Sequence, residues 1–488
     1  MLKTTLKYLI KDSAFYGLGN GVSKSLQLIT LPLVVKSVSN TDFSNWNMIQ
    51  ASTAIIAGIV LFGMDSAAAR FYYDVKTSNE KKQIFTNSLL IQILLSVILL
   101  PLSFAAILPL ERFSGIADHY RNDLIIMLLW MPAAAVTNFF IGWFKWTFQK
   151  WNFFILTFGF ALLNLLLLLY FTLAGTLTIH RVVQITLFCQ CIMVIYAVLI
   201  SGKYLTKSVS FKLSKELLKY GGPLMIVTVL GILRASLDRF FLVHYINDND
   251  FAMYSFAQKL STIIFLAVTA FDFAFNPLVF SMWEKPEAKM VFSKIQSLYI
   301  MGMVGMSLMI MSCSVPLIIG MGKASYVAAA YFLPFMLFAN FAYGLINFAF
   351  IGINYSKKTY LLLILIVIAL SAMALFNLLL IKNLTIYAAS ASLLFANIIL
   401  VVLGYIFSAP HYHIKYNFKK DIPVFLLGLL LSFPFGFVKL YSNIYWDAAI
   451  KLLISGALFL VLTRLFFFSE MKLVVNKFLG KDKPVVEL

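Results

Sequence analysis

Charged residues are scarce in this sequence. Asp, Glu, Lys and Arg together make up 12% of its 488 residues, whereas hydrophobic residues make up 61%, and the mean hydropathy is +0.90. A soluble domain of this size could not solvate so apolar a surface. The composition therefore excludes a soluble enzyme or a soluble binding protein and indicates an integral membrane protein.

Cysteines and catalytic motifs are also nearly absent. Three cysteines cannot build a disulfide framework, and two of them, Cys189 and Cys191, lie two positions apart on one predicted helix and so point to different faces. The sequence contains no HExxH, no GxSxG, no phosphate-binding loop and no zinc-ligand spacing among its five histidines. We therefore predict that the protein is not an enzyme and that it binds no metal and no cofactor.

Long hydrophobic stretches dominate what is present. About fourteen of them are long enough to cross a bilayer as helices. This pattern predicts an all-α polytopic membrane protein. The expected spans are 13–35, 45–69, 84–110, 123–144, 153–175, 182–202, 220–246, 252–281, 295–320, 326–354, 359–381, 386–408, 423–440 and 447–469.

The net charge of +19 comes mostly from Lys and Arg residues in the loops between these spans, and these residues are unevenly distributed between the two sides of the membrane. Alternate connections on the side of the N-terminus hold 26 of the 39 Lys and Arg residues, the opposite side holds eight, and five lie within spans. An excess of basic residues marks the cytoplasmic side of a membrane protein. We therefore expect both termini in the cytoplasm, and the charge indicates topology rather than binding to nucleic acid.

The sequence carries an internal duplication. Polar and aromatic landmarks that begin span 2 recur at the start of span 8 with an offset of 208: Asp42, Phe43, Trp46 and Gln50 match Asp250, Phe251, Tyr254 and Gln258. Later landmarks recur as well, with Pro132, Asn138, Phe139 and Gly142 matching Pro334, Asn340, Phe341 and Gly344. Spans 1–6 and 7–12 are therefore predicted to form two pseudo-symmetric six-helix lobes with a central site at their interface.

The duplication predicts four parts of the chain. Residues 1–202 would form the N-terminal lobe and residues 220–408 the C-terminal lobe, joined by a basic, amphipathic cytoplasmic linker at 203–219. Residues 409–488 would hold spans 13 and 14, which lie outside the repeat, and a cytoplasmic tail.

Two cations lie near the middle of predicted spans, Lys24 in the first and Arg234 in the seventh. A cation at that depth is costly and usually faces a cavity, a partner or a substrate. Asn20 and Gln27 share one helical face with Lys24 and are expected to line the cavity or to bond between helices. A basic interior suits an anion, so the pattern predicts a transporter of a negatively charged substrate.

Further charged residues extend this candidate site. Arg70, Arg239 and Lys259 are added to its cationic wall, although Arg70 at the cytoplasmic mouth also serves topology and Lys259 could reach the far surface. Three carboxylates, Asp65, Asp238 and Asp272, are candidates either for ion pairs or for ion coupling. Asp238 lies one helical turn after Arg234 and could neutralise it, while Asp65 and Asp272 are repeat mates that could pair with Arg70 and Arg234.

Several motifs together resemble the Wzx-type polysaccharide flippases, a branch of the multidrug/oligosaccharidyl-lipid/polysaccharide (MOP) exporter superfamily. The motifs are Tyr16–Gly17–Leu18–Gly19, the link Ser39–Asn40–Thr41–Asp42–Phe43 followed by Trp46, the segment from Gly63 to Tyr72, and Leu237–Asp238–Arg239–Phe240. The resemblance implies a MATE-like fold in a bacterial inner membrane. It further implies transport of undecaprenyl-pyrophosphate-linked oligosaccharide to the outer leaflet by alternating access, among membrane lipids and other polysaccharide-assembly proteins.

Two other functions compete with this interpretation. A cation-coupled multidrug antiporter of the same fold would carry more acidic residues in its interior, and only Asp65, Asp238 and Asp272 favour it. A membrane polysaccharide polymerase or glycosyltransferase would need catalytic acids and a large outer loop. Asp248–Asn249–Asp250 resembles the acidic metal-binding pair of glycosyltransferases, but it is expected on the non-cytoplasmic side, and Asp250 already matches Asp42 in the repeat.

Overall fold

The structure is a computed structural model that describes residues 2–105, 107–356, 358 and 360–467, with the backbone alone for residues 2–18 and 20. The described residues form helices and short connections and contain no strand, which confirms the predicted all-α class. The last predicted segment, the tail from residue 468, lies outside the described residues, as does the side chain of Asn20.

The chain divides into two compact units. Unit 1 comprises Met1–Lys259 and Leu362–Leu393, and unit 2 comprises Leu260–Leu361 and Leu394–Leu488. The borders fall inside two long helices, α12 (Asp248–Met282) and α17 (Tyr360–Ser408), rather than in the linker at 203–219. The two lobes drawn from the internal repeat stay a prediction, and the units are described separately below.

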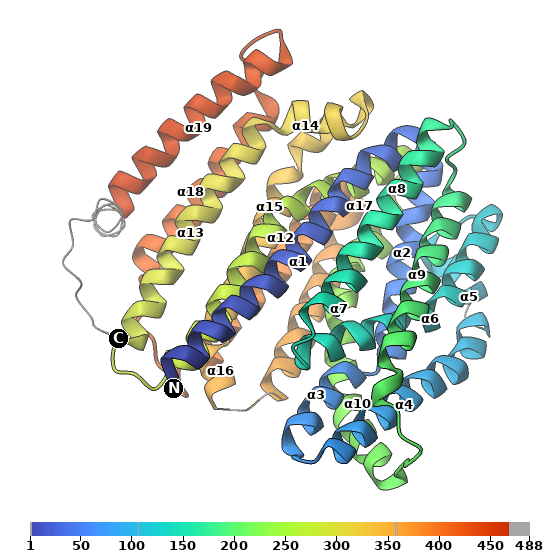
Figure 1. The fold of residues 1–488 in the computed structure, drawn as a ribbon. Helices are drawn as coiled ribbons and strands as arrows, with labels where there is room; N and C mark the ends of the chain where they lie inside the picture. Colours follow the sequence, from blue (N-terminus) through green and yellow to red (C-terminus); the bar gives the residue numbers. More distant parts are fainter. Residues whose placement is uncertain (1, 106, 357, 359, 468–488) are drawn as a thin grey trace. The chain divides into compact units, whose positions relative to one another are not determined.

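Unit 1 holds the first half of the helices (Figure 1). Besides parts of α12 and α17, its elements are α1 (Leu2–Ser37), α2 (Asn40–Leu61), α3 (Met64–Asp74), α4 (Ser78–Ala105), α5 (Ile107–Ser114), η1 (Asp118–Tyr120), α6 (Arg121–Trp146), α7 (Lys150–Phe154), the π-helical turn η2 (Ile155–Gly159), α8 (Phe160–Leu173), α9 (Ile179–Ser201), η3 (Gly202–Tyr204), α10 (Phe211–Arg234) and α11 (Leu237–Leu242).

Unit 2 holds the remaining helices. In addition to the rest of α12 and α17, they are α13 (Ala288–Ser312), α14 (Ser314–Met321), η4 (Ala324–Tyr331), α15 (Leu333–Ala349), α16 (Ile351–Tyr355), α18 (Phe418–Phe437) and α19 (Ile444–Phe466). Helix α13 packs along both α18 and α19, so the predicted spans 13 and 14 lie against predicted span 9 (Figure 1).

Twelve helices in the described part of the chain are long and apolar enough to cross a membrane. Helix α17, with 49 residues, contains both predicted spans 359–381 and 386–408, and its one non-helical residue, Thr385, lies between them. The 36 residues of α1 contain the first predicted span. The structure therefore supports a polytopic membrane protein, and the number of about fourteen spans stays a prediction.

The predicted span 45–69 is not one helix, which corrects the sequence-based expectation. Phe62 and Gly63 both have left-handed backbone conformations, with φ of 50° and 65°, and they end α2 before α3 begins. A Cβ at Gly63 would lie 2.9 Å from the carbonyl oxygen of Gly221 in α10, so glycine lets α10 cross the break closely. The corresponding stretch of the second repeat, in α12, has no break.

Aromatic side chains fill the core of unit 1 at the level of α3. Phe85 of α4 lies 4.7 Å from Trp143 of α6, measured between ring centroids, and it also contacts Phe139 and Phe140. These rings are buried together with Ala67 and Ala68 of α3. Aromatic packing of this kind holds α3 on α6, and it thereby fixes the neighbouring Asp65 against the same helix.

The core of unit 2 repeats this arrangement with different residues. Phe275 of α12 lies 4.4 Å from Phe348 of α15, and Tyr299 of α13 contacts Phe271 and Phe348. A Cβ at Gly344 of α15 would overlap the hydroxyl oxygen of Tyr299, so glycine makes room for this ring. The aromatic cluster positions Asp272 of α12 beside α15, as the first cluster positions Asp65 beside α6.

Candidate functional site

The two repeat-related helices α2 and α12 begin with the same kind of cap. Ser39 and Asp42 form a capping box, in which the Asp42 amide donates to the Ser39 hydroxyl and the Asp42 carboxylate accepts from Ser39. At the matching positions, the Asp250 amide donates to the Asn247 side chain, and that side chain donates back to the Asp250 carboxylate. The predicted offset of 208 therefore marks equivalent helix starts.

These two helix starts also touch each other within unit 1. The Asn40 side-chain amide donates to the Asn249 side chain over 2.8 Å, and the Ser44 hydroxyl donates to Asp248 over 3.2 Å. The acidic residues of the Asp248–Asn249–Asp250 segment are thus used in helix capping and in this contact. In the described part of the chain, no group of His, Cys, Asp and Glu residues could hold a metal ion.

One helical turn further along α12, a buried polar network surrounds Asp238 of α11. The Asp238 side chain is fully buried, and its carboxylate accepts a short hydrogen bond from the Tyr254 hydroxyl. Gln258 donates to the same carboxylate oxygen over 3.5 Å and accepts a hydrogen bond from the Arg239 guanidinium over 2.5 Å. Gln258 therefore links the buried carboxylate to a half-buried cation.

A second cation of this region is held by the matching glutamine. The Lys259 ammonium donates to the Gln50 side chain of α2 over 3.1 Å and lies 5.2 Å from the centroid of the Phe43 ring. Gln50 and Gln258 are repeat mates, so each copy of the repeat provides one glutamine that accepts from a cation.

Basic residues outnumber acidic ones in and beside this network. Asp238 has one carboxylate oxygen, Oδ1, without a hydrogen-bond partner in the described structure. Against its single negative charge stand Arg239, Lys259 and Arg234, and Arg234 is 7% exposed at the end of α10, four residues before Asp238. Three basic residues thus stand beside one buried carboxylate in α10, α11 and the first part of α12.

The predicted helix over 220–246 is interrupted, which corrects the expectation that Arg234 and Asp238 lie one turn apart on a single helix. Helix α10 ends at Arg234 and α11 begins at Leu237, so Arg234 and Asp238 do not lie in one uninterrupted helix. Helix α10 also begins at Phe211, so it includes the end of the predicted linker.

On α1, Lys24 is half-buried and the side chain of Gln27 is exposed. Whether Lys24 and Gln27 line a substrate cavity stays a prediction.

Arg70 does not join the cationic network. Its guanidinium lies 3.7 Å from Asp74 on the same face of α3, and both side chains are more than half exposed. An exposed ion pair of this kind contributes little to stability. Arg70 therefore pairs with Asp74 rather than with Asp65, one of the partners considered for it, because Asp74 lies one turn further along the same helix. Whether Arg70 contacts the substrate stays a prediction.

The repeat mates Asp65 and Asp272 have different surroundings. Asp65 packs so tightly on α6 that a Cβ at Gly142 would lie 2.8 Å from its own Cβ, and its charge is attracted by that of Lys145. Asp272 accepts a hydrogen bond of 2.5 Å from the Asn347 side chain of α15. An offset of 202 relates Lys145 to Asn347, as it relates Gly142 to Gly344. The residue beside the aspartate is therefore a cation in the first copy of the repeat and an amide in the second.

This difference predicts unequal effects of two matched substitutions. Asp65→Asn removes the carboxylate that acts on the half-buried Lys145, whereas Asp272→Asn keeps an oxygen that can accept from Asn347. We expect the two substitutions to change the free energy of unfolding by amounts that differ by about 1 kcal/mol. Thermal unfolding of the purified variants in detergent measures the difference.

Equal stability of the two variants would contradict this assignment. The same variants test ion coupling: if either aspartate couples transport to protons, its asparagine variant should transport independently of the proton gradient. Unchanged dependence in both variants would exclude both residues as the coupling site.

Four residues of these networks were not among the predicted site residues: Gln50, Tyr254, Gln258 and Lys145. The first three were already visible as landmarks of the duplication. These three residues could have been predicted, because a polar residue inside a membrane span needs a hydrogen-bond partner, and they lie at positions that match between the two repeats. Lys145 was counted with the cytoplasmic loops, because it follows the hydrophobic part of span 4 directly.

Comparisons with known proteins agree with this architecture. The family described as "Polysaccharide biosynthesis protein" matches residues 9–283, which is more than half of the chain. Among curated proteins, none matches the chain.

Solved structures with a similar fold include MATE transporters. A mutant of the Vibrio cholerae MATE transporter VcmN is 16% identical, with a TM-score of 0.55, over 83% of this chain and 98% of its own. An outward-facing multidrug resistance MATE family transporter of the MOP superfamily is 14% identical, with a TM-score of 0.60, over 82% of this chain and 95% of its own. At these identities the similarity shows the fold, which is MATE-like as predicted.

Proposed function

Because this chain belongs to the family of polysaccharide biosynthesis proteins and has the fold of MATE transporters, we propose that it exports an undecaprenyl-pyrophosphate-linked oligosaccharide. The substrate would move from the cytoplasmic to the outer leaflet of a bacterial inner membrane by alternating access. The coarser statement, a multi-pass membrane protein of the MOP flippase and exporter type, follows from the family and the fold directly.

The observation that supports the proposal is the group of basic residues that donate to Gln50 and Gln258 around Asp238. A pyrophosphate bears several negative charges and crosses hydrocarbon only when they are compensated. Arg239 and Lys259 each donate a hydrogen bond to a neutral glutamine oxygen, which fixes the position of both basic groups. Guanidinium and ammonium groups form strong charge-assisted hydrogen bonds with phosphate oxygens. Arg234 and Lys24 would complete this cationic wall.

Each part of the substrate has a suitable environment in this mechanism. The pyrophosphate would bind the cations, the sugars would occupy the hydrated space of the transporter, and the polyprenyl chain would stay in the surrounding lipid. The protein would open to alternate sides while the cations hold the phosphate. Neither a cofactor nor bond chemistry is needed, and other polysaccharide-assembly proteins would supply and consume the substrate.

Binding of the isolated anchor tests the proposal. Purified protein should bind undecaprenyl pyrophosphate at least tenfold more tightly than the uncharged undecaprenol in native mass spectrometry, since each hydrogen bond to a charged group contributes about 1.5–3 kcal/mol. Lys259→Gln should remove most of this preference. Arg464→Gln, which changes an exposed cation in the last turn of α19, should retain it. Equal affinity of wild-type protein for the two lipids would contradict the proposal.

A drug antiporter is the second candidate, since the similar solved structures include a multidrug resistance transporter. It would use the buried Asp238 to bind organic cations, and the three neighbouring cations oppose this. Efflux of a cationic dye that is lost in Asp238→Asn would favour this candidate over the flippase.

The proposed orientation places both termini in the cytoplasm. In a variant with all three cysteines replaced by alanine, single cysteines at His119 and Ser442 should react with an impermeant maleimide in intact cells. Cysteines at Ser78 and Lys207 should react only after permeabilisation. All four positions are exposed in the structure, so accessibility depends on the side of the membrane. The reverse labelling pattern would invert the orientation and the proposed direction of transport.

A further inference from the structure

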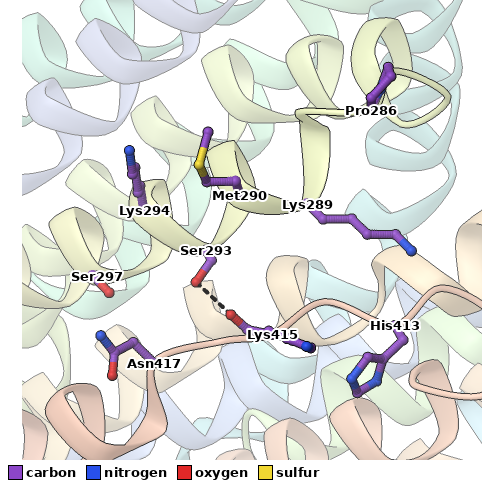
Figure 2. Close-up of a pocket in the computed structure, with 9 residues that line it drawn as sticks. All are labelled: Pro286, Lys289, Met290, Ser293, Lys294, Ser297, His413, Lys415 and Asn417. Atoms are coloured by element: carbon purple, nitrogen blue, oxygen red, sulfur yellow. Dashed lines mark hydrogen bonds between the residues drawn. The ribbon is translucent and has the colours of Figure 1, made fainter.

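Unit 2 contains a basic pocket at the start of α13 that none of the predicted site residues lines. Its volume is about 550 Å³, and nine residues of α13, of the segment before it and of the segment before α18 line it (Figure 2). They include three lysines, Lys289, Lys294 and Lys415, together with His413, and none of the nine is acidic. Such a lining suits an anion.

The walls of this pocket are held by specific contacts. The Ser293 hydroxyl of α13 donates to the carbonyl oxygen of Lys415 over 3.0 Å, as Figure 2 shows. The Lys289 side chain extends from α13 over the Tyr412 ring, at 5.1 Å from its centroid. The Tyr412 hydroxyl donates to the carbonyl oxygen of Trp283. The cations are therefore carried by two connected walls rather than by one flexible loop.

An apolar groove of about 430 Å³ begins beside the pocket. Helices α13, α15, α17 and α18 form it, and its lining is almost entirely aliphatic and aromatic. Val402, Ile406 and Ile422 line this groove and are each about half exposed. In a membrane, such a groove faces the lipid chains.

A buried polar cluster joins the groove to the pocket. Asp421 of α18 lines the groove and accepts hydrogen bonds from Ser297 and Gln296 of α13 over 2.8 and 3.0 Å. Ser297 also lines the basic pocket. Each oxygen of the Asp421 carboxylate thus accepts from a neutral donor, and its side chain is 2% exposed.

We propose that the pocket and the groove together bind an anionic phospholipid. The phosphate headgroup would contact Lys289, Lys294 and Lys415, and an acyl chain would lie in the groove against α17 and α18. Basic pockets between membrane helices on the cytoplasmic side are suited to anionic lipid headgroups, and these lysines belong to the side predicted as cytoplasmic. A free phosphate would use the lysines alone and leave the groove unfilled.

The bound lipid would act as a bridge between α18 and α13. The headgroup would connect the segment before α18 with the start of α13, and the chain would cover the seam between the two helices. Phospholipid should therefore stabilise the second unit. The proposal does not depend on the transported substrate, because its residues are separate from those of the network around Asp238.

The test measures lipid binding and thermal stability of the full-length protein in neutral detergent after removal of lipid. Phosphatidylglycerol should bind in native mass spectrometry and raise the melting temperature, whereas phosphatidylcholine should do so weakly. The triple variant Lys289→Gln, Lys294→Gln, Lys415→Gln should bind phosphatidylglycerol roughly a hundredfold more weakly, since each such lysine contributes about fivefold. The triple variant Lys207→Gln, Lys212→Gln, Lys215→Gln makes the same charge change at exposed sites of unit 1 and should bind normally.

A second variant separates a lipid from a soluble anion. Val402→Trp places a bulky side chain in the groove and leaves the lysines intact, so it should weaken binding of phosphatidylglycerol. Wild-type affinity in Val402→Trp, with inorganic phosphate giving the same stabilisation, would overturn the proposal in favour of a simple anion site. Tenfold tighter binding of undecaprenyl phosphate than of phosphatidylglycerol would overturn it in favour of a substrate-lipid site. Equal binding by the two triple variants would overturn it altogether.

Discussion

Arg234→Ala and Lys24→Ala are expected to abolish oligosaccharide export while the protein still accumulates in the membrane. Each substitution removes one charge from the proposed cationic wall, and each hydrogen bond to a charged phosphate contributes about 1.5–3 kcal/mol. Complementation of a strain that lacks the protein, with surface polysaccharide as the readout, measures the loss. Arg234→Lys should retain part of the activity if a point charge suffices and lose it if the flat guanidinium binds two phosphate oxygens.

Arg464→Ala is the control for these substitutions. It removes an exposed cation from the last turn of α19, outside the network, and should leave export unchanged. Normal export by Arg234→Ala and Lys24→Ala would contradict the cationic site, provided that both variants accumulate to the level of the wild type.

Asp238→Ala should produce the largest loss of stability among the substitutions considered. Asp238 is fully buried, and its carboxylate accepts from both Tyr254 and Gln258. Removing it leaves the neighbouring cations without a buried counter-charge, which costs about 3–5 kcal/mol. The variant should accumulate poorly and unfold at a clearly lower temperature, as measured by fluorescence-detected size exclusion and thermal unfolding in detergent.

Two further variants show whether the charge or the hydrogen bond matters. Tyr254→Phe removes one donor to Asp238 and should cost only about 1 kcal/mol. Asp74→Ala removes a carboxylate that is paired with the exposed Arg70, and it should leave the melting temperature unchanged. If Asp238→Ala were as stable as Asp74→Ala, the network would not hold α11 to α12.

The fold was largely predictable because hydrophobic length determines where a chain can cross a membrane. The spans and the internal repeat were therefore readable from the sequence. The break within predicted span 45–69 was not: Phe62 and Gly63 adopt left-handed conformations where α10 crosses. Such breaks depend on packing between distant helices, which a single sequence does not display.

The charged residues of the candidate site could be predicted from the sequence, but most of the residues that form hydrogen bonds with them could not. Asp238, Arg239 and Lys259 lie in one polar region, as expected from their place in spans. The glutamines that hold the two cations were recognised only as landmarks of the repeat. Arg70 was assigned to the site by its position in sequence, yet one helical turn places it beside Asp74 at the surface. Pairing between helices requires the three-dimensional structure.

The most direct test is translocation by the purified protein in vesicles. Proteoliposomes that contain an undecaprenyl-pyrophosphate-linked oligosaccharide should expose it on the opposite leaflet, where an added lectin or glycosidase detects it. Wild-type protein should raise the rate of exposure well above that of protein-free vesicles, and Arg234→Ala should reduce it to that background. The same rate for the wild-type protein, the Arg234→Ala variant and empty vesicles would contradict the proposed export function.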